Sequence, residues 1–258
     1  MKKRKQFAPS VAMNSRLKLK LDWCSHEAAK YACEHWHYSR CIPKSKLVKI
    51  GVWENQKFVG VVIFSPGATP NLGSPYGLTQ TQCVELSRVA LTRHGTPVSR
   101  VLAIALKFLT SANQKLRLVV SFADPDQGHH GGIYQAANWI YNGTGSDNTF
   151  YLINGKKTHP RTIGHAGHIQ NLQGAIKMDR NAKAIKCQGK HRYLMPLDNE
   201  MRRRIVPLSK PYPKKCAESE TVDTPANHAG KGGSFPTSAL HTYDVGNNEE
   251  TTAATDTV

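Results

Sequence analysis

The sequence lacks the features that would place the protein in a membrane or in an oxidising compartment. Its longest apolar run, residues 58–64, is far shorter than the roughly 20 residues that span a bilayer. The basic start of the chain is not followed by the apolar core of a signal peptide. The six cysteines form no C-x-x-C pair and no zinc-ligand spacing. We therefore expect a cytoplasmic protein with reduced thiols and no membrane partner.

Acidic residues are scarce, and they are concentrated at the end of the chain. The 258 residues include 35 Lys and Arg but 18 Asp and Glu, which gives a formal net charge of +17. Seven of the acidic residues and a single lysine lie beyond residue 216. The part before it is strongly basic and attracts polyanions, of which nucleic acid is the commonest. A membrane surface and general solubility are the alternatives.

The composition divides the chain into three parts. Residues 1–15 read as a basic N-terminal arm, and residues 16–212 carry enough apolar periodicity for one catalytic domain. Residues 213–258 have hardly any such periodicity and are rich in Thr, Asn, Gly and Ala, which predicts a disordered acidic tail.

Apolar spacing predicts an α/β fold with a mixed central sheet flanked by helices. A strand, a helix and another strand in succession imply a parallel pair with a crossover. Residues 66–81 are rich in Gly, Pro, Asn and Ser and predict a long surface loop. Residues 177–190 are expected to be partly helical. The expected strands are 16–21, 47–53, 58–65, 83–91, 116–123, 149–153 and 192–197, and the expected helices 26–36, 98–109 and 132–141.

Residues 119–134 contain the strongest catalytic signal of the chain. A buried strand ends at Asp124, passes through a loop with His129 and His130, and enters a helix with Tyr134. Ligand crevices form at such strand ends in open α/β sheets. Asp124 is a candidate general base, with Tyr134 as an acid or an orienting hydroxyl. The alternatives are that Asp124 caps the following helix and that the histidines are surface residues.

The loop before the helix at residue 98 predicts an anion site. Free N–H groups at the helix start, near Arg93, Gly95, Ser99 and Arg100, favour a group such as pyrophosphate. A structural helix cap is an equally good interpretation. The order of strand, loop, helix, strand and helix is similar to the core of GNAT acetyltransferases, in which this loop binds acetyl-CoA. The loop here offers only Arg93-x-Gly95 in place of the usual Q/R-x-x-G-x-G/A pattern.

A closer resemblance, to the bacteriophage Mom proteins, covers residues 16–212. The motifs that carry it follow one another in order along the chain. They are His37-Tyr38-Ser39, Glu85-Leu86-Ser87-Arg88, Ser99-Arg100, Ser121-Phe122-Ala123-Asp124, Ile133-Tyr134 and Lys190-His191-Arg192-Tyr193.

Members of that family are GNAT-like and install a carbamoylmethyl (acetamido) group on the exocyclic amine of adenine in DNA, which protects phage DNA from host restriction. The resemblance implies catalytic roles for His37, Tyr38, Asp124 and Tyr134 and cofactor roles for Arg88 and Ser99. It implies acetyl-CoA as a cofactor. Attaching the carbon next to a carbonyl calls for an oxidising or radical step, for which iron is a second candidate cofactor. His37, Tyr38 and Asp124 are its candidate ligands, with His129 and His130 as further donors.

The resemblance also implies double-stranded DNA as partner, in the cytoplasm of a bacterial host during infection. Reaching the amine of adenine requires flat side chains for stacking and cations for phosphates. The stacking candidates are Trp36, Tyr38, Trp53 and Tyr76, although Trp53 suits the core equally well. The phosphate-binding candidates are Lys44, Lys46, Arg161, Lys186, Lys190, Arg192, Arg202, Arg203 and Arg204.

Two other functions are compatible with the same residues. A conventional acetyl-CoA-dependent N-acetyltransferase of a protein or a small amine would use the same fold. A basic DNA-binding protein without catalysis would show the same charge.

Overall fold

The computed structural model describes residues 18–214 of the chain. The expected N-terminal arm and nearly all of the expected acidic tail lie outside these residues. Within them, no helix is long and apolar enough to cross a membrane.

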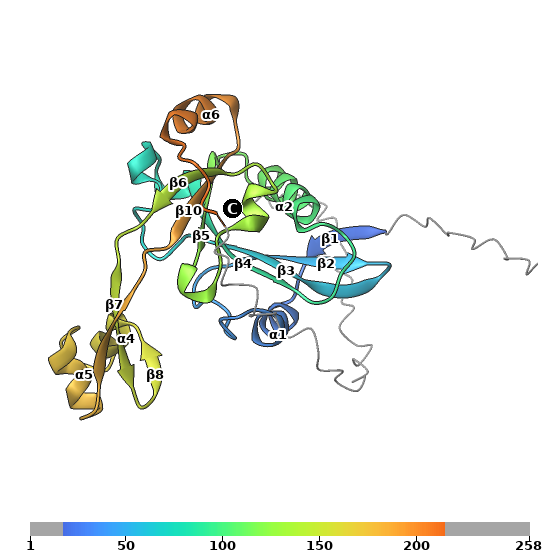
Figure 1. Ribbon diagram of the computed structural model, residues 1–258. Coiled ribbons are helices and arrows are strands. Elements are labelled where there is room, and N and C mark those ends of the chain that lie inside the picture. Colours follow the sequence, from blue (N-terminus) through green and yellow to red (C-terminus); the bar gives the residue numbers. More distant parts are fainter. Residues whose placement is uncertain (1–17, 215–258) are drawn as a thin grey trace, which may run out of the picture. The chain divides into compact units, whose positions relative to one another are not determined.

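The described residues form a mixed α/β fold around a seven-stranded sheet (Figure 1). Neighbouring strands are antiparallel except for one parallel pair, β4 and β5. Helix α2 (Val98–Ala112) connects these two strands, as the sequence predicted. The strand order is β1 (Leu19–Trp23), β2 (Val48–Glu54), β3 (Lys57–Ser65), β4 (Cys83–Leu91), β5 (Leu118–Ala123), β10 (His191–Pro196) and β6 (Ile140–Thr144).

Helices cover both faces of this sheet because side chains alternate along each strand. Val62, Phe64 and Leu86 lie on the face that α2 covers. Val61 and Ile63 lie on the other face, against α1 (His26–Trp36). Figure 1 shows α1 and α2 on opposite sides of the sheet. Helix α6 (Asn199–Ile205) shares the α1 face and packs on Cys83, Leu118 and Val120.

The parallel pair opens at one end, and this opening positions the functional residues. Strands β4 and β5 pair only from Cys83 with Leu118 to Leu86 with Ser121. Beyond that point β4 carries a bulge at Ser87, because Phe64 pairs with Leu86 whereas Ile63 pairs with Arg88. The extra residue turns Arg88 to the same face as Glu85, which is the face that α1 covers.

A smaller sheet is inserted between β6 and β10. Its strands are β7 (Asn148–Ile153), β8 (Lys156–Thr158) and β9 (Lys183–Cys187), in the order β8-β7-β9. Helices α4 (Pro160–His165) and α5 (Leu172–Met178) pack on one face through Ile163 and Ala175. Figure 1 shows these elements together, apart from the larger sheet.

The predicted helix at 132–141 is wrong. Helix α3 covers only Gly132–Gln135, and its continuation turns at Asn138, whose φ is 57°. The buried side chain of Trp139 then leads into β6, which pairs with β10. Tertiary pairing with a strand some 50 residues later decides this segment, and its apolar spacing alone indicates a helix.

The predictions for residues 177–190 and 66–81 also need correction. Residues 177–190 hold only the end of α5, because Asp179 ends that helix and β9 pairs with β7. The predicted surface loop 66–81 contains two short 3-10 turns, η1 (Ser74–Tyr76) and the start of η2 (Gln80–Gln82). Tyr76 and Leu78 are buried against α6 and the sheet, so this segment forms part of the core. Two further 3-10 turns are η3 (Pro125–Gln127) and η4 (Val206–Leu208).

Candidate functional site

Ionisable side chains gather where β4 and β5 part. We call this group the strand-end cluster and define it as His37, Tyr38, Glu85, Arg88, Asp124 and His129. The centroid of the Tyr38 ring lies 4.3 Å from the centroid of the His37 ring. It lies 4.9 Å from that of the His129 ring, in an edge-to-face arrangement. The charges of Asp124, Arg88 and Glu85 all act on the Tyr38 hydroxyl. The fold thus brings His37, Tyr38 and Asp124 together.

Arg88 holds the loop after α1 against β4. Its Nε donates to the Cys41 carbonyl at 3.3 Å, and its Nη1 donates to the Ser87 carbonyl at 2.7 Å. The bulge at Ser87 makes this reach possible, because it turns Arg88 toward α1. Arg88 therefore lies in the strand-end cluster, and its hydrogen bonds go to Cys41 and to the carbonyl of Ser87.

His37 is a neutral imidazole whose proton position follows from its contacts. Burial, with help from the charges of Arg88 and His129, lowers its pKa to about 3. The Ser39 backbone N–H donates to His37 Nδ1 at 3.1 Å, so Nδ1 accepts and the ring proton lies on Nε2. With its proton on Nε2, His37 can donate a hydrogen bond to a substrate oxygen but is a poor general base.

Asp124 both caps a turn and pairs with a lysine. Its Oδ1 accepts from the backbone N–H of Asp126 at 3.2 Å, at the start of η3. Its Oδ2 lies 3.4 Å from Nζ of Lys190, the residue before β10. The capping contact that the sequence offered as an alternative is therefore present, and Oδ2 is the oxygen left for proton transfer.

Tyr134 ends a buried hydrogen-bond chain. Ser121 Oγ lies 2.8 Å from both the Tyr134 hydroxyl and the Leu86 carbonyl. The Ser121 hydroxyl is the donor in both contacts, so its one proton is shared between the Leu86 carbonyl and the Tyr134 hydroxyl oxygen. Burial raises the pKa of Tyr134 to about 12. In this arrangement Tyr134 fixes the strand end by accepting from Ser121.

Glu85 is a site residue to which the sequence analysis gave no role. Burial raises the pKa of its carboxyl, against the opposing charges of Arg88 and Lys190. Gly67, at a φ of 89°, brings the backbone after β3 onto this carboxyl, and a Cβ there would lie 3.5 Å from Glu85 Oε2. Strand β4 also contains Ser87 and Arg88, so nothing in the sequence of this strand sets Glu85 apart.

The predicted anion site at the start of α2 already holds a carboxylate. The backbone N–H groups of Gly95 and Thr96 donate to Glu54 of β2 at 2.9 and 2.6 Å. Burial opposes ionisation of Glu54, but these hydrogen bonds outweigh it and lower its pKa. The side chains of Arg93 and Arg100 are exposed at the same loop. Glu54 thus occupies the two N–H groups that a pyrophosphate would use.

The donor types expected for iron are present in the strand-end cluster. Neutral histidines and a carboxylate are ligands that iron accepts. Among residues 18–214, however, no three His, Cys, Asp or Glu side chains lie close enough to hold an ion. Ligation by His37, Tyr38 and Asp124 stays a prediction, which iron analysis of the purified protein would test.

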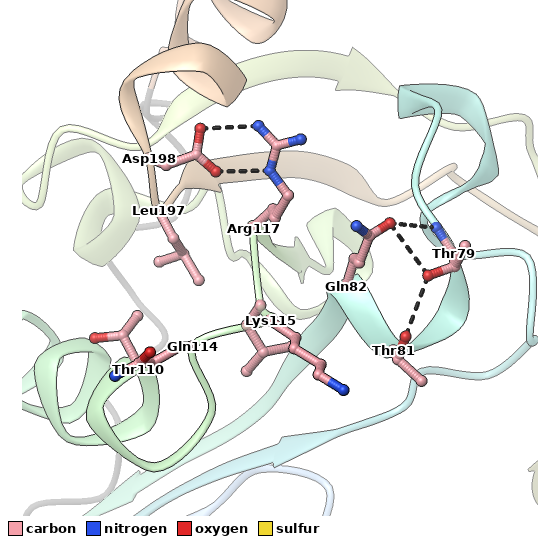
Figure 2. Close-up of a pocket in the computed structure, with 10 residues that line it drawn as sticks. Thr79, Thr81, Gln82, Thr110, Gln114, Lys115, Arg117, Leu197 and Asp198 are labelled. Atoms are coloured by element: carbon pink, nitrogen blue, oxygen red, sulfur yellow. Dashed lines mark hydrogen bonds and ion pairs between the residues drawn. The ribbon is translucent and has the colours of Figure 1, made fainter.

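Two cavities adjoin β4 and β5, at different ends. The larger, of about 560 Å³, lies at the start of both strands and beside the end of α2 (Figure 2). Its charged groups are largely paired with one another, as in the two hydrogen bonds of Arg117 to Asp198 at 2.8 and 3.0 Å. The smaller, of about 270 Å³, lies under residues 66–79 and includes Glu85. Only the smaller cavity shares a residue with the strand-end cluster.

The residues predicted to bind DNA lie on several elements. Lys44 and Lys46 are exposed on the loop after α1, and Lys186 is exposed on β9. Arg202 and Arg203 are exposed on α6. The other arginines make specific contacts near the smaller cavity: Arg192 lies over the Phe122 ring, Arg161 donates to the Ala68 carbonyl, and Arg204 donates to the Tyr76 carbonyl.

The predicted stacking residues divide between core and site. Trp53 lies 5.5 Å from Phe58 between ring centroids, and Trp36 packs on the same ring at 5.9 Å. Tyr38 is 44% exposed in the strand-end cluster, and Tyr76 lines the smaller cavity. Tyr38 and Tyr76 are therefore the two that remain near the site.

Together, the fold and the site define a mixed α/β protein: a sheet whose one parallel pair, joined by a helix, opens at a group of ionisable side chains. The model of the Mom protein family matches residues 18–214. The chain therefore belongs to the Mom protein family.

Two known proteins illustrate the similarity. The Mom protein of Escherichia phage Mu, described as a methylcarbamoylase, is 27% identical over 203 residues, which cover 76% of this chain and 84% of that protein. A solved structure of an unconfirmed acetyltransferase from Acinetobacter baylyi ADP1 aligns with a TM-score of 0.41 and 12% identity. It covers 72% of this chain and 96% of its own.

Proposed function

We propose that the protein is a phage DNA-modification enzyme that transfers a carbamoylmethyl group to the exocyclic amine of adenine in double-stranded DNA. The observation that carries this proposal is the strand-end cluster of a Mom family member, where His37, Tyr38, Glu85 and Asp124 meet. The product would protect phage DNA from restriction in the cytoplasm of the infected bacterium.

The proposed reaction needs a proton acceptor, because the lone pair of the adenine amine is delocalised into the ring. As the bond from N6 to the methyl carbon of the donor forms, the amine loses one proton and that carbon loses one hydrogen, and the two electrons released pass to an oxidant. Iron, when bound by His37, Tyr38 and Asp124, would supply this oxidation. Asp124 Oδ2 accepts the proton of the amine, with Lys190 beside it at 3.4 Å. His37, with its proton on Nε2, donates a hydrogen bond to the donor.

Acetyl-CoA is proposed as a cofactor because the strand, loop and helix that would bind it are present. Arg93, Arg100 and the first turn of α2 near Ser99 would hold its pyrophosphate. Such binding requires Glu54 to leave the N–H groups of Gly95 and Thr96.

Mass spectrometry of nucleosides tests the reaction directly. DNA from bacteria that express the protein should contain an adenosine heavier by one carbamoylmethyl group. Unmodified adenosine in cells that contain soluble, DNA-binding protein would contradict the proposal. Acetylated protein or polyamine in its place would indicate a conventional acetyltransferase.

The Asp124→Asn variant separates catalysis from binding. The amide keeps the size of the side chain and can still accept from the Asp126 N–H, but it cannot take a proton. We expect modified adenosine to fall by ~100-fold or more, which is the range for a general base, with DNA affinity unchanged. Undiminished modification would refute the base assignment. Asp147→Asn, on the smaller sheet's entry loop, is the matched control.

A further inference from the structure

The smaller cavity has the size and lining of a binding site for one planar base. It encloses about 270 Å³ under residues 66–79, which we call the cover segment. This volume lies just below the ~300–1,000 Å³ typical of small-molecule pockets. The cavity is too small for a whole nucleotide cofactor. Its lining residues are Ala68, Thr69, Asn71, Leu72, Pro75, Tyr76, Glu85, Val120, Phe122 and Arg192.

The walls of the cavity are aromatic and apolar. Phe122 comes from the end of β5 and Tyr76 from the cover segment, with Leu72 and Val120 beside them. Arg192 lies over the Phe122 ring, with 5.8 Å between its guanidinium carbon and the ring centroid. Enzymes that act on a base inside DNA hold it, once extruded, between such side chains.

The polar groups of the cavity suit adenine. The amide of Asn71 offers one donor and one acceptor side by side, the pattern that pairs with N6 and N7 of adenine. A protonated carboxyl at Glu85 would match N1 and N6 in the same way, and burial raises the pKa of this carboxyl. Adenine can meet both patterns at once, through N6 with N7 and through N6 with N1, whereas thymine can meet only one of them, through N3–H and O4, because its other edge carries the methyl group.

The cavity is built before any base arrives. Tyr76 donates from its hydroxyl to Asn142 of β6 at 3.1 Å, and Arg204 of α6 donates to the Tyr76 carbonyl at 3.1 Å. Arg161 of α4 donates to the Ala68 carbonyl at 3.4 Å. Three elements thus hold the cover segment, and two of these contacts bring arginines to its rim, where DNA phosphates would lie.

Glu85 joins the cavity to the strand-end cluster. It lines the cavity, and its charge acts on the hydroxyls of both Tyr38 and Tyr134. A base whose amine reaches Glu85 is therefore at the entrance to the proposed catalytic groups. We propose that this cavity receives the extruded adenine, held by Tyr76 and Phe122 and read by Asn71 and Glu85. This inference rests on the proposed function, because it assigns the substrate site of that reaction.

Binding of short oligo(dA) and oligo(dT) strands, followed by fluorescence anisotropy with the full chain, tests the inference without requiring turnover. The wild type should bind oligo(dA) more tightly by at least ~5-fold, the lower bound for one good bidentate contact. Asn71→Leu and Glu85→Leu should each reduce this ratio toward one and leave oligo(dT) affinity unchanged. Glu85→Gln, whose amide offers a donor and an acceptor, should retain most of it.

Control variants distinguish the loss of contacts in the cavity from the loss of the folded structure. Asn71 is exposed, so its replacement leaves the core intact, and circular dichroism checks each variant. Asn181→Leu, in the exposed turn after α5, is the matched control and should keep the ratio. Phe122→Ala should weaken oligo(dA) binding more than oligo(dT) binding. An oligo(dA) preference that is absent from the wild type, or that survives in folded Asn71→Leu and Glu85→Leu, would overturn the inference.

The nucleoside assay distinguishes this failure from failure of the proposed function. If DNA is modified and the Asn71→Leu and Glu85→Leu variants still modify it fully, the reaction stands and the adenine site is elsewhere. If adenosine is never modified but the oligo(dA) preference depends on Asn71 and Glu85, the cavity stands as an adenine site and the reaction is wrong.

Discussion

At the level of single residues, the neighbours of each ionisable side chain determine which chemistry it can perform. His37 could serve as a base in another setting, yet the Ser39 backbone N–H donates to its Nδ1, so the ring proton lies on Nε2. Tyr134 could serve as an acid, yet burial raises its pKa to about 12, which makes it a weak one. The groups left with free acceptor capacity are the carboxylates Asp124 and Glu85.

The depressed pKa of His37 predicts a loss of stability in acid. Its pKa is about 3 in the folded protein and close to 6.5 when unfolded, so the unfolded chain binds more protons between these values. Unfolding free energy should therefore fall as pH drops from about 6.5, by up to ~1.4 kcal/mol per pH unit from this residue. Urea titrations at several pH values would measure it.

The variant His37→Asn should show a shallower pH dependence of stability than the wild type. His35→Asn is the matched control, because His35 lies on the same helix end with its ring bonded to the Tyr31 carbonyl. Equal slopes for His37→Asn and the wild type would contradict the assignment of a buried, neutral His37.

The contacts of Glu54 with the start of α2 predict how tightly this helix start binds a phosphate group. Its carboxylate repels an anion and fills the N–H groups of Gly95 and Thr96. Glu54→Gln should bind coenzyme A more tightly than the wild type, by roughly 3- to 5-fold. Removing one negative charge next to a helix start is worth ~0.5–1 kcal/mol to a bound anion. Isothermal titration calorimetry would measure this, with Glu27→Gln on α1 as control. Weaker binding by Glu54→Gln would show that Glu54 supports the site.

At the scale of elements, the parting of β4 and β5 creates the site. The Ser87 bulge turns Arg88 toward α1, and Arg88 in turn holds the loop that carries His37 and Tyr38. On the other side of the opening, α6 and α4 hold the cover segment through Arg204 and Arg161. Distant helices therefore determine the shape of the smaller cavity.

The start of α6 predicts a graded effect of mutation on stability. Asp198 caps α6 by accepting from the Met201 N–H at 2.7 Å and also pairs with Arg117. Asp198→Asn keeps a capping oxygen and loses the ion pair, whereas Asp198→Ala loses both. The alanine variant should be less stable than the asparagine variant by roughly 1 kcal/mol, the usual value of an N-cap. Urea unfolding would measure the difference, and equal stability of the two variants would contradict the capping role.

At the scale of the whole molecule, charge is separated along the chain. The residues up to 216 carry nearly all of the 35 basic residues, and seven acidic residues follow. Basic residues on the loop after α1, on the smaller sheet and on α6 give the described part a positive surface on several elements. Binding to DNA should therefore weaken steeply with salt.

We predict that the acidic C-terminal residues compete with DNA for the basic surface of the protein. They lie outside the described residues, and the family match ends at residue 214. Truncation after Lys215 should leave the fold intact and tighten DNA binding at low salt, because negative charge is removed. Electrophoretic mobility shifts at two salt concentrations would measure this. Weaker binding by the truncated chain would mean that the C-terminal residues contribute to DNA binding.

The elements whose pattern is local could be predicted from the sequence. Ser25 before α1, the hairpin of β2 and β3, and the apolar stripe of α2 all follow from propensity and spacing. The parallel pairing of β4 and β5 followed from the strand, helix and strand order. The motifs also led to the family, and they included His37, Tyr38, Arg88 and Asp124.

Only the tertiary structure decided the features that depend on distant partners. Residues 140–144 form a strand because β10 lies beside them, and Tyr76 is buried because α6 covers it. Glu54 fills the start of α2 from a strand 41 residues earlier in the chain. Glu85 became a site residue through burial, since a carboxylate in a strand pattern carries no sign of its surroundings. Local sequence sets backbone preference, whereas pairing and burial are settled by what the rest of the chain brings alongside.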